Sequence, residues 1–461
     1  MTTITDNTPV LVGIGVIGQK LDDWEQAKEA SELMCDAALA ALEDAGCAGQ
    51  GGGVDRIYVP RGLWHYGDPA RLVGDAIGAA AATSILVEIG VMQQTAVGDA
   101  CRQIAEGAAD MTLVVGGEAR YRGLRAQIAG TEAPETEQKQ APDITMTPTA
   151  ELYLDAELNS GLGYMPVNYY AIMESAFRAA HGWSLDHNRD RLAAMYSRFS
   201  EIATDNPHAW KPGSVAAETI RDPSPKNPML AFPYTKLHNT SWNVDQAGAL
   251  LFCSAKRAAE LGIPRQRWLF PLVSAECSHM LSVAQRRELH RVPGVKAAGA
   301  LMLEQAGCGP QDLDLLELYS CFPIAVESYA AEMGIDLQRD LTVTGGIPFA
   351  GGPLNNYVIQ STCRMAELLR EGRGKTGLVS CVSGLMTKQG LGLWSTEPGS
   401  SGFEVIDVTE AVAADNPPME VVDDFSGDAT IAGCTVMYQL GEPQRAVAMV
   451  NTDDGKRAVV W

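Results

Sequence analysis

Hydrophobic residues follow two different spacings along the chain, which predicts alternating strands and helices. The short apolar runs Val10–Ile14 and Leu269–Val273 are typical of buried strands. Residues 30–41 instead carry apolar side chains at helical spacing. Gly46 follows that predicted helix, where a left-handed residue commonly ends a helix. The alternation predicts an α/β protein built from stacked layers of helices and sheets.

The pattern occurs twice. The segment Ala41–Cys47 resembles Met302–Cys308, and the two cysteines are 261 residues apart. Cys101 and Cys363 each precede an arginine within a helical pattern, and they are 262 residues apart. Two independent segments with nearly the same offset indicate the tandem duplication of one α/β unit.

The segments that fall outside the duplication predict additional units. Helical patterns at about residues 168–181 and 187–204 indicate a mostly helical insertion. A linker rich in Ser, Gly and Pro follows residue 395, and short β-like runs come after it. The expected units are an N-terminal half (1–120 with 241–265), an inserted subdomain (121–240), a C-terminal half (266–395) and a small β-rich C-terminal domain (403–461).

Charge and composition narrow the possible partners. The formal net charge is −22, which disfavours nucleic acid and anionic membranes, so an anionic ligand needs a local basic or N–H-rich site. We expect no transmembrane helix, because no run of about 18 apolar residues occurs, and no leader in the short polar N-terminus. Ten scattered cysteines without a CxxC pair indicate reduced thiols in the cytoplasm. Seven histidines without ligand spacing predict no metal site.

Several local motifs, in this order, resemble the thiolase superfamily. They are Asp68–Arg71 (Asn-Pro-Ala-Arg in the family), Asn239–Ser241 with Asp245–Ala247 (Asn-Ala-Ser and Asn-Asp-Gly), Glu317–Phe322 (the Asn-Glu-Ala-Phe region), Gly345–Pro353 (the Gly-His-Pro loop) and Leu378–Gly384 (the second cysteine). The resemblance covers about residues 8–395. It implies a duplicated thiolase fold with five layers, α/β/α/β/α. It also implies coenzyme A or acyl-CoA as ligand, bound by Asn239 and Ser241 with His238 beside the pocket.

The departures from the family pattern concern the reacting centre. Counting back from Gly107 puts the family's nucleophilic cysteine at Gly90, and its Gly-His-Pro histidine at Gly352. The asparagine that positions an oxyanion-hole water falls on Tyr319. Glycine cannot form a thioester, so covalent acyl transfer by the family's route is not expected. This pattern resembles the thiolase-like proteins of type 1, which bind coenzyme A and carry an extra C-terminal domain.

Some chemistry remains available at this degenerate centre. Cys381 matches the family's second cysteine and would move a proton at the carbon beside a thioester carbonyl, with Tyr319 and Cys321 as neighbouring donors. Backbone N–H groups near Gly90 and Ser383 are candidates for an oxyanion hole. These features predict carbon–carbon bond chemistry on acyl-CoA in lipid metabolism, as an acyltransferase-class or retro-aldol reaction. The alternative is a non-catalytic acyl-CoA-binding or scaffold protein, in which Cys381 is only a small buried residue.

The resemblance also carries expectations about partners. No cofactor is expected to be required besides the CoA thioester itself. Thiolases usually pair through the strand before the nucleophile, here Thr83–Ile89, so we expect a homodimer, with a monomer as the rival from the type 1 group. A second protein subunit is a further possibility, bound through the C-terminal β domain.

Overall fold

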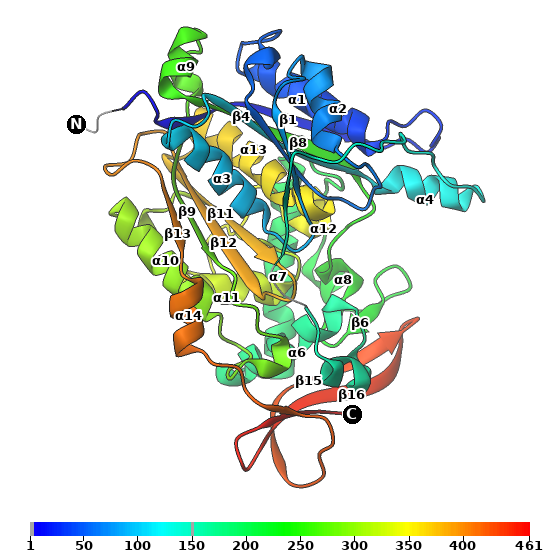
Figure 1. Ribbon diagram of the computed structural model, residues 1–461. Helices are drawn as coiled ribbons and strands as arrows, with labels where there is room; N and C mark the ends of the chain where they lie inside the picture. Colours follow the sequence, from blue (N-terminus) through cyan, green and yellow to red (C-terminus); the bar gives the residue numbers. More distant parts are fainter. Residues whose placement is uncertain (1–3, 149–151) are drawn as a thin grey trace.

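The computed structural model describes residues 4–148 and 152–461, and its strands and helices alternate as the hydrophobic pattern predicts (Figure 1). Its first sheet has the order β1-β8-β4-β2-β3-β5. The strands are β1 (Pro9–Gln19), β8 (Asp245–Ser254), β4 (Met111–Ala119), β2 (Arg56–Pro60), β3 (Thr83–Val87) and β5 (Ile144–Met146). The central strands β1, β8 and β4 are antiparallel, and β4, β2, β3 and β5 run parallel.

The second sheet has the order β10-β11-β12-β9-β13. Its strands are β10 (Leu315–Glu317), β11 (Thr376–Ser383), β12 (Lys388–Ser395), β9 (Phe270–Cys277) and β13 (Glu404–Asp407). The run β9-β12-β11-β10 pairs antiparallel, antiparallel and parallel, as β1-β8-β4-β2 does in the first sheet. The duplication read from the sequence is therefore present in the topology.

Helices fill the space between the two sheets and cover both outer faces (Figure 1). The helices of the two halves are α1 (Ala30–Asp44), α2 (Pro69–Ile77), α3 (Gln93–Ala105), α9 (Ala255–Glu260), α10 (Pro293–Ala306), α11 (Pro323–Met333), α12 (Ile347–Ala350) and α13 (Tyr357–Arg370). Helices α1 and α2 contact the first sheet, α10 contacts the second, and α3 and α13 contact both. This arrangement is the predicted five-layer α/β/α/β/α fold, with buried apolar clusters on both sides of each sheet.

A third sheet joins the insertion to the C-terminal segment. The insertion contains α4 (Arg120–Ile128), α5 (Asp155–Glu157), α6 (Pro166–Ala180), α7 (Leu185–Thr204), α8 (Ala217–Arg221), β6 (Met229–Ala231) and β7 (Tyr234–Thr235). The C-terminal segment contains α14 (Thr409–Asp415), β14 (Val421–Val422), β15 (Ala429–Gln439), β16 (Glu442–Thr452) and β17 (Arg457–Val460). The sheet order is β14-β17-β16-β15-β6-β7, and α6 packs on β15. None of the helices described is both long and apolar enough to cross a bilayer.

The boundary of the C-terminal unit differs from the expected one. The run at residues 404–407, expected in the C-terminal β domain, forms β13 and pairs in parallel with β9 of the second sheet. It pairs there because the outer edge of β9 presents unpaired backbone groups that a passing segment can satisfy. The C-terminal sheet therefore starts later, at Val421.

The expected dimer strand is covered by the chain itself. β5 pairs with β3 in parallel, from Ile85 with Ile144 to Val87 with Met146. Asp143, just before β5, accepts a hydrogen bond from the Ser84 N–H at 2.9 Å. The outer edge of Thr83–Ile89 is thus not free to pair with a second subunit over these residues, which contradicts the expected route to a homodimer.

Candidate functional site

The first turn of α3 lies unusually close to β12, and two glycines make this approach possible. A Cβ atom at Gly390 would lie 2.9 Å from the Cβ of Gln94, and one at Gly392 would lie 2.8 Å from the Gln94 Oε1. Gly390 pairs with Cys381 on the neighbouring strand β11. The N–H groups of Gln93 and Gln94, which have no partner within the helix, therefore reach the Cys381 thiol.

Cys381 is a buried thiol at a helix N-terminus. Cys381 is only 1% exposed. Burial raises the pKa of the Cys381 thiol to about 12, and the N–H groups of Gln94 and Gln93 offset this only in part. The Tyr329 hydroxyl donates to the Cys381 carbonyl at 2.8 Å and fixes the strand. At neutral pH, Cys381 is therefore a protonated thiol beside a helix N-terminus that would stabilise its thiolate.

Tyr319 and Cys321 lie in the loop after β10, close to Cys381. Burial raises the pKa of Cys321 to about 12 and raises the pKa of Tyr319, and the nearby Cys381 thiol adds to both increases. The Tyr319 ring meets the Tyr357 ring edge-on, with 5.4 Å between centroids. The Tyr170 hydroxyl, which donates to the Gly384 carbonyl at 3.1 Å, lies near the Cys321 thiol and opposes the increase in its pKa. The structure thus brings together Cys381, Tyr319 and Cys321, and all three are protonated at neutral pH.

Gly90 presents its carbonyl to two donors. Its φ is +102°, a conformation that side-chain-bearing residues rarely adopt. The Gly90 carbonyl accepts hydrogen bonds from the Lys388 ammonium at 2.5 Å and from the Ser383 hydroxyl at 3.4 Å. Ser383 therefore reaches this loop through its side chain, whereas the sequence pointed to its backbone N–H.

Gly352 lies against the expected coenzyme A segment. Its N–H donates to the Ser241 carbonyl at 2.9 Å, and the Thr240 hydroxyl donates to the Cys321 carbonyl at 3.4 Å. A Cβ atom at Gly352 would lie 2.5 Å from the Thr240 Cγ2 and 2.6 Å from the Ile347 Cγ2. A larger residue at position 352 would displace Thr240. The expected coenzyme A segment therefore lies next to Gly352 and to the loop that carries Cys321.

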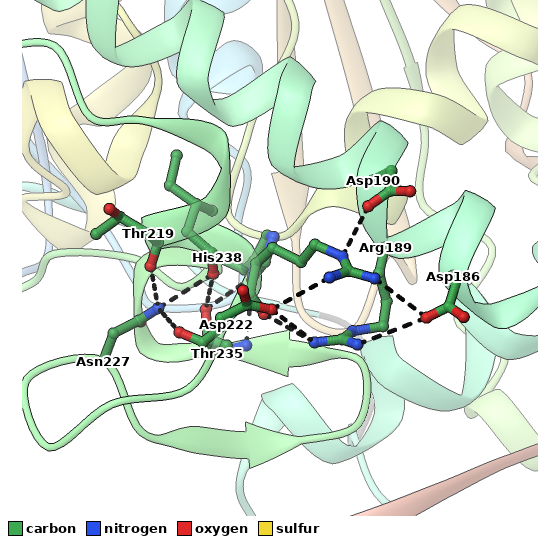
Figure 2. A network of polar contacts seen from close by, with 10 residues as sticks. Asp186, Arg189, Asp190, Thr219, Asp222, Asn227, Thr235 and His238 are labelled. Carbon is green, nitrogen blue, oxygen red and sulfur yellow. Dashed lines mark hydrogen bonds and ion pairs between the residues drawn. The ribbon is translucent and has the colours of Figure 1, made fainter.

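His238 has a buried, structural environment. The Thr235 hydroxyl and the His238 Nδ1 are hydrogen-bonded at 3.0 Å, and the Tyr196 ring lies 5.4 Å away. Burial lowers the pKa of His238 to about 3. The Asn239 side-chain amide donates to the Thr235 carbonyl at 2.7 Å. Figure 2 shows this region, which contains Asp186, Arg189, Asp190, Thr219, Asp222, Asn227, Thr235 and His238. His238 and the Asn239 amide thus make internal contacts that hold the segment in shape.

Three exposed lysines, Lys20, Lys211 and Lys236, form a basic cluster beside the same segment. Partial burial and the charges of Lys236 and Lys20 lower the pKa of Lys211, which indicates that both of these lysines lie near Lys211. Lys20 lies 5.0 Å above the Trp210 ring. The N–H of Asn239 donates to the Lys236 carbonyl at 3.1 Å. Within residues 4–148 and 152–461, none of these lysines forms an ion pair. In a chain of net charge −22, this cluster is a local concentration of positive charge.

A solved structure with this architecture identifies the fold. The monomeric SCP2-thiolase-like protein type 1 from Mycobacterium smegmatis superposes with a TM-score of 0.82 and 25% identity, covering 99% of this chain and 92% of that protein. The chain has the thiolase fold. The thiolase-fold chain also superposes on the dimeric peroxisomal thiolase of Saccharomyces cerevisiae, with a TM-score of 0.59 and 18% identity over 86% of this chain and 99% of that one.

Curated sequences similar to the thiolase-fold chain agree with this assignment. The acetyl-CoA acetyltransferase of Methanothermobacter thermautotrophicus is 25% identical over 388 residues, which cover 79% of this chain and 92% of that protein. The acetyl-CoA acetyltransferase of Methanocaldococcus jannaschii is 24% identical, over 65% of this chain and 69% of that protein. No protein-family model matches the chain.

Sequence reasoning missed two parts of this thiolase-fold site. Lys388 was not singled out, although it follows Ser383 by five residues and pairs with it across the β11–β12 turn. The lysine cluster was also missed, because its members are far apart in the sequence. A period-two reading of β12 would have put Lys388 on the same face as Gly390 and Gly392.

Proposed function

We propose that the chain binds acyl-CoA thioesters and breaks or forms the carbon–carbon bond between C2 and C3 without an acyl-enzyme intermediate. The observation that carries this proposal is that Tyr319 and Cys321 lie close to Cys381, which itself lies at the N-terminus of α3. Protonated donors beside a helix dipole suit proton transfer at a carbon next to a thioester. Gly90 has no side chain that could attack a thioester. Its positive φ also disfavours any residue with a side chain at this position.

The lysine cluster supports coenzyme A as the recognised part of the substrate. Lys20, Lys211 and Lys236 offer three cations to the phosphates of a nucleotide. Ser241 and Thr240, which contact Gly352 and Cys321, connect this cluster to the reacting centre. An extended ligand that bridges both would carry a charged nucleotide end and a buried thioester end, as acyl-CoA does.

A retro-aldol cycle on a β-hydroxyacyl-CoA accounts for the three side chains. The cycle starts from the deprotonated form of Cys381, a minor form at neutral pH because the pKa of the thiol is about 12. The N–H groups of Gln93 and Gln94 stabilise this thiolate, which takes the proton of the 3-hydroxyl. The C2–C3 electron pair moves to the thioester enolate as the aldehyde or ketone leaves. Cys381 then returns the same proton to C2, while Tyr319 and Cys321 supply donors around it. No proton is gained or lost overall. A solved structure described as the Ltp2-ChsH2(DUF35) aldolase superposes with a TM-score of 0.64 and 18% identity, covering 86% of this chain and 100% of that one. An aldolase is therefore found among the structures that share this fold.

The test is turnover of a panel of β-hydroxyacyl- and β-ketoacyl-CoA substrates, followed by mass spectrometry of the products. We expect cleavage by the wild-type chain, and about a 100-fold or larger loss of kcat in Cys381→Ala. Cys434→Ala is the matched control, because Cys434 is exposed on β15. Unchanged turnover in Cys381→Ala would disprove this mechanism. Double replacement of Lys20 and Lys236 by Glu should raise the Kd for coenzyme A at least 10-fold.

A non-catalytic role in acyl-CoA binding is the second candidate. The observation that favours it is the third sheet, which ties the C-terminal segment to the insertion through β15 and β6 and offers a surface for a second subunit. Coenzyme A binding by calorimetry, with no product from any substrate in the panel, would support this candidate over the enzyme. The covered edge of β3 favours a monomeric chain in both cases.

A further inference from the structure

Lys388 is a nearly buried cation with few partners. It is 5% exposed, at the start of β12. Its ammonium donates one hydrogen bond, to the Gly90 carbonyl at 2.5 Å. No carboxylate of the described residues lies within ion-pair distance of it, and Glu276 acts on it only from further away. An ammonium has three donors, so two remain without a partner in the residues described.

The charge of Lys388 is costly where it lies. Burial lowers the pKa of Lys388, and the Glu276 carboxylate opposes that shift. Glu276 is itself engaged, because it accepts a hydrogen bond from the Thr95 hydroxyl at 2.6 Å. Buried charges without a partner are rare in proteins, and they cluster at sites of chemistry. A purely structural bond to one carbonyl would need only a neutral donor.

The position of Lys388 is at the reacting centre. A Cβ atom built on Gly90 would lie 3.0 Å from the Pro148 Cβ and 3.9 Å from the Lys388 Nζ, so the ammonium and the Pro148 ring both lie beside the position where the family's nucleophile is expected. Ser383 pairs with Lys388, and Cys381 pairs with Gly390 two residues further along the same face. Lys388 and Cys381 therefore approach this space from one sheet face, beside the start of α3.

We propose that Lys388 is a catalytic residue that donates to the thioester carbonyl oxygen of a bound acyl-CoA and stabilises the enolate formed as the C2–C3 bond breaks. This inference rests on the proposed function. The electron pair of the breaking bond becomes the enolate, whose oxygen carries the negative charge next to the ammonium. The charge returns to C2 when Cys381 gives back its proton, so Lys388 keeps all three of its protons throughout. Its task is electrostatic.

Two non-reactive probes separate this role from coenzyme A binding. S-ethyl-CoA is a neutral thioether, whereas S-carboxymethyl-CoA carries a carboxylate that stands in for the enolate. Calorimetry on the full chain should give a Kd for S-carboxymethyl-CoA that rises 10- to 100-fold in Lys388→Gln, as expected for the loss of a charged hydrogen bond. The Kd for S-ethyl-CoA should change less than 2-fold. Glutamine removes the charge and keeps an N–H donor near the end of the side chain.

Further variants make the result decisive. Lys388→Arg, which keeps the charge, should retain S-carboxymethyl-CoA binding within about 5-fold, and the exposed Lys256→Gln should bind both probes as the wild type does. Thermal melting verifies that each variant is folded. If Lys388→Gln binds both probes as the wild type does, the Lys388 inference is wrong and the proposed function stands. If the wild type binds neither probe, the proposed function fails, and the inference fails with it.

Discussion

The close approach of α3 to β12 can be tested by filling the space at Gly390. In Gly390→Ala, the new methyl group would lie 2.9 Å from the Gln94 Cβ and 3.2 Å from the Cys381 Cβ. Both distances are below ordinary van der Waals contact, and neither neighbour is the end of a flexible chain. The first turn of α3 must therefore move away from the sheet by several tenths of an ångström. That movement withdraws the helix N–H groups from Cys381.

Overpacking of this kind costs about 1 to 3 kcal/mol of unfolding free energy. We expect Gly390→Ala to lower the urea midpoint accordingly, and turnover to fall further than stability because the N–H donors move. Gly392→Ala should cost less, because its methyl group meets only the flexible amide end of Gln94. Gly123→Ala is the control, since a Cβ atom there meets nothing within 4 Å and the residue lies in α4. That change should be stabilising by about 0.5 to 1 kcal/mol.

The ranking of the three variants decides the matter. The contradicting result is a Gly390→Ala variant that is as stable as the wild type, or no less stable than Gly392→Ala. In that case the absence of a side chain at position 390 is not what allows α3 to approach β12. A destabilised Gly390→Ala with unchanged turnover would keep the packing argument. It would reject the role of the α3 N-terminus in supporting Cys381.

Three further predictions follow from the site and the sheet edge. With a pKa of about 12, Cys381 should react with iodoacetamide at pH 8 at least 100-fold more slowly than exposed Cys434, by peptide mass spectrometry; comparable rates would contradict the burial. The folded pKa of His238 is about 3, below the free value of 6.5, so its contribution to stability is present above pH 6.5 and is lost toward pH 3. In urea titrations between pH 3 and pH 6.5, His238→Gln should reduce the slope of unfolding free energy against pH by about 1.4 kcal/mol per pH unit. An unchanged slope would disprove this account. Light scattering should give a monomer mass near 49.2 kDa, since β5 covers β3; twice that mass would require another interface.

The sequence was sufficient for the architecture, because architecture depends on periodic patterns. The helical patterns near residues 168–181 and 187–204 correspond to α6 and α7 within a few residues. The repeat predicted two equivalent sheets, and their strands pair in the same way. Gly46 and Gly307 have φ values of +74° and +65°, as expected for residues that end helices. Such features are local or repeat at a fixed offset, so one chain is enough to reveal them.

The sequence also named Cys381, Tyr319 and Cys321, and only the tertiary structure decided what surrounds them. Lys388 and the lysine cluster became visible only when distant segments met, because electrostatic partners are set by distance in space. The coverage of the β3 edge also depends on tertiary structure, because β5 pairs with β3 from about 60 residues further along the chain. Periodicity and motifs thus determined the frame, while burial, charge and edge pairing depended on contacts that no single segment encodes.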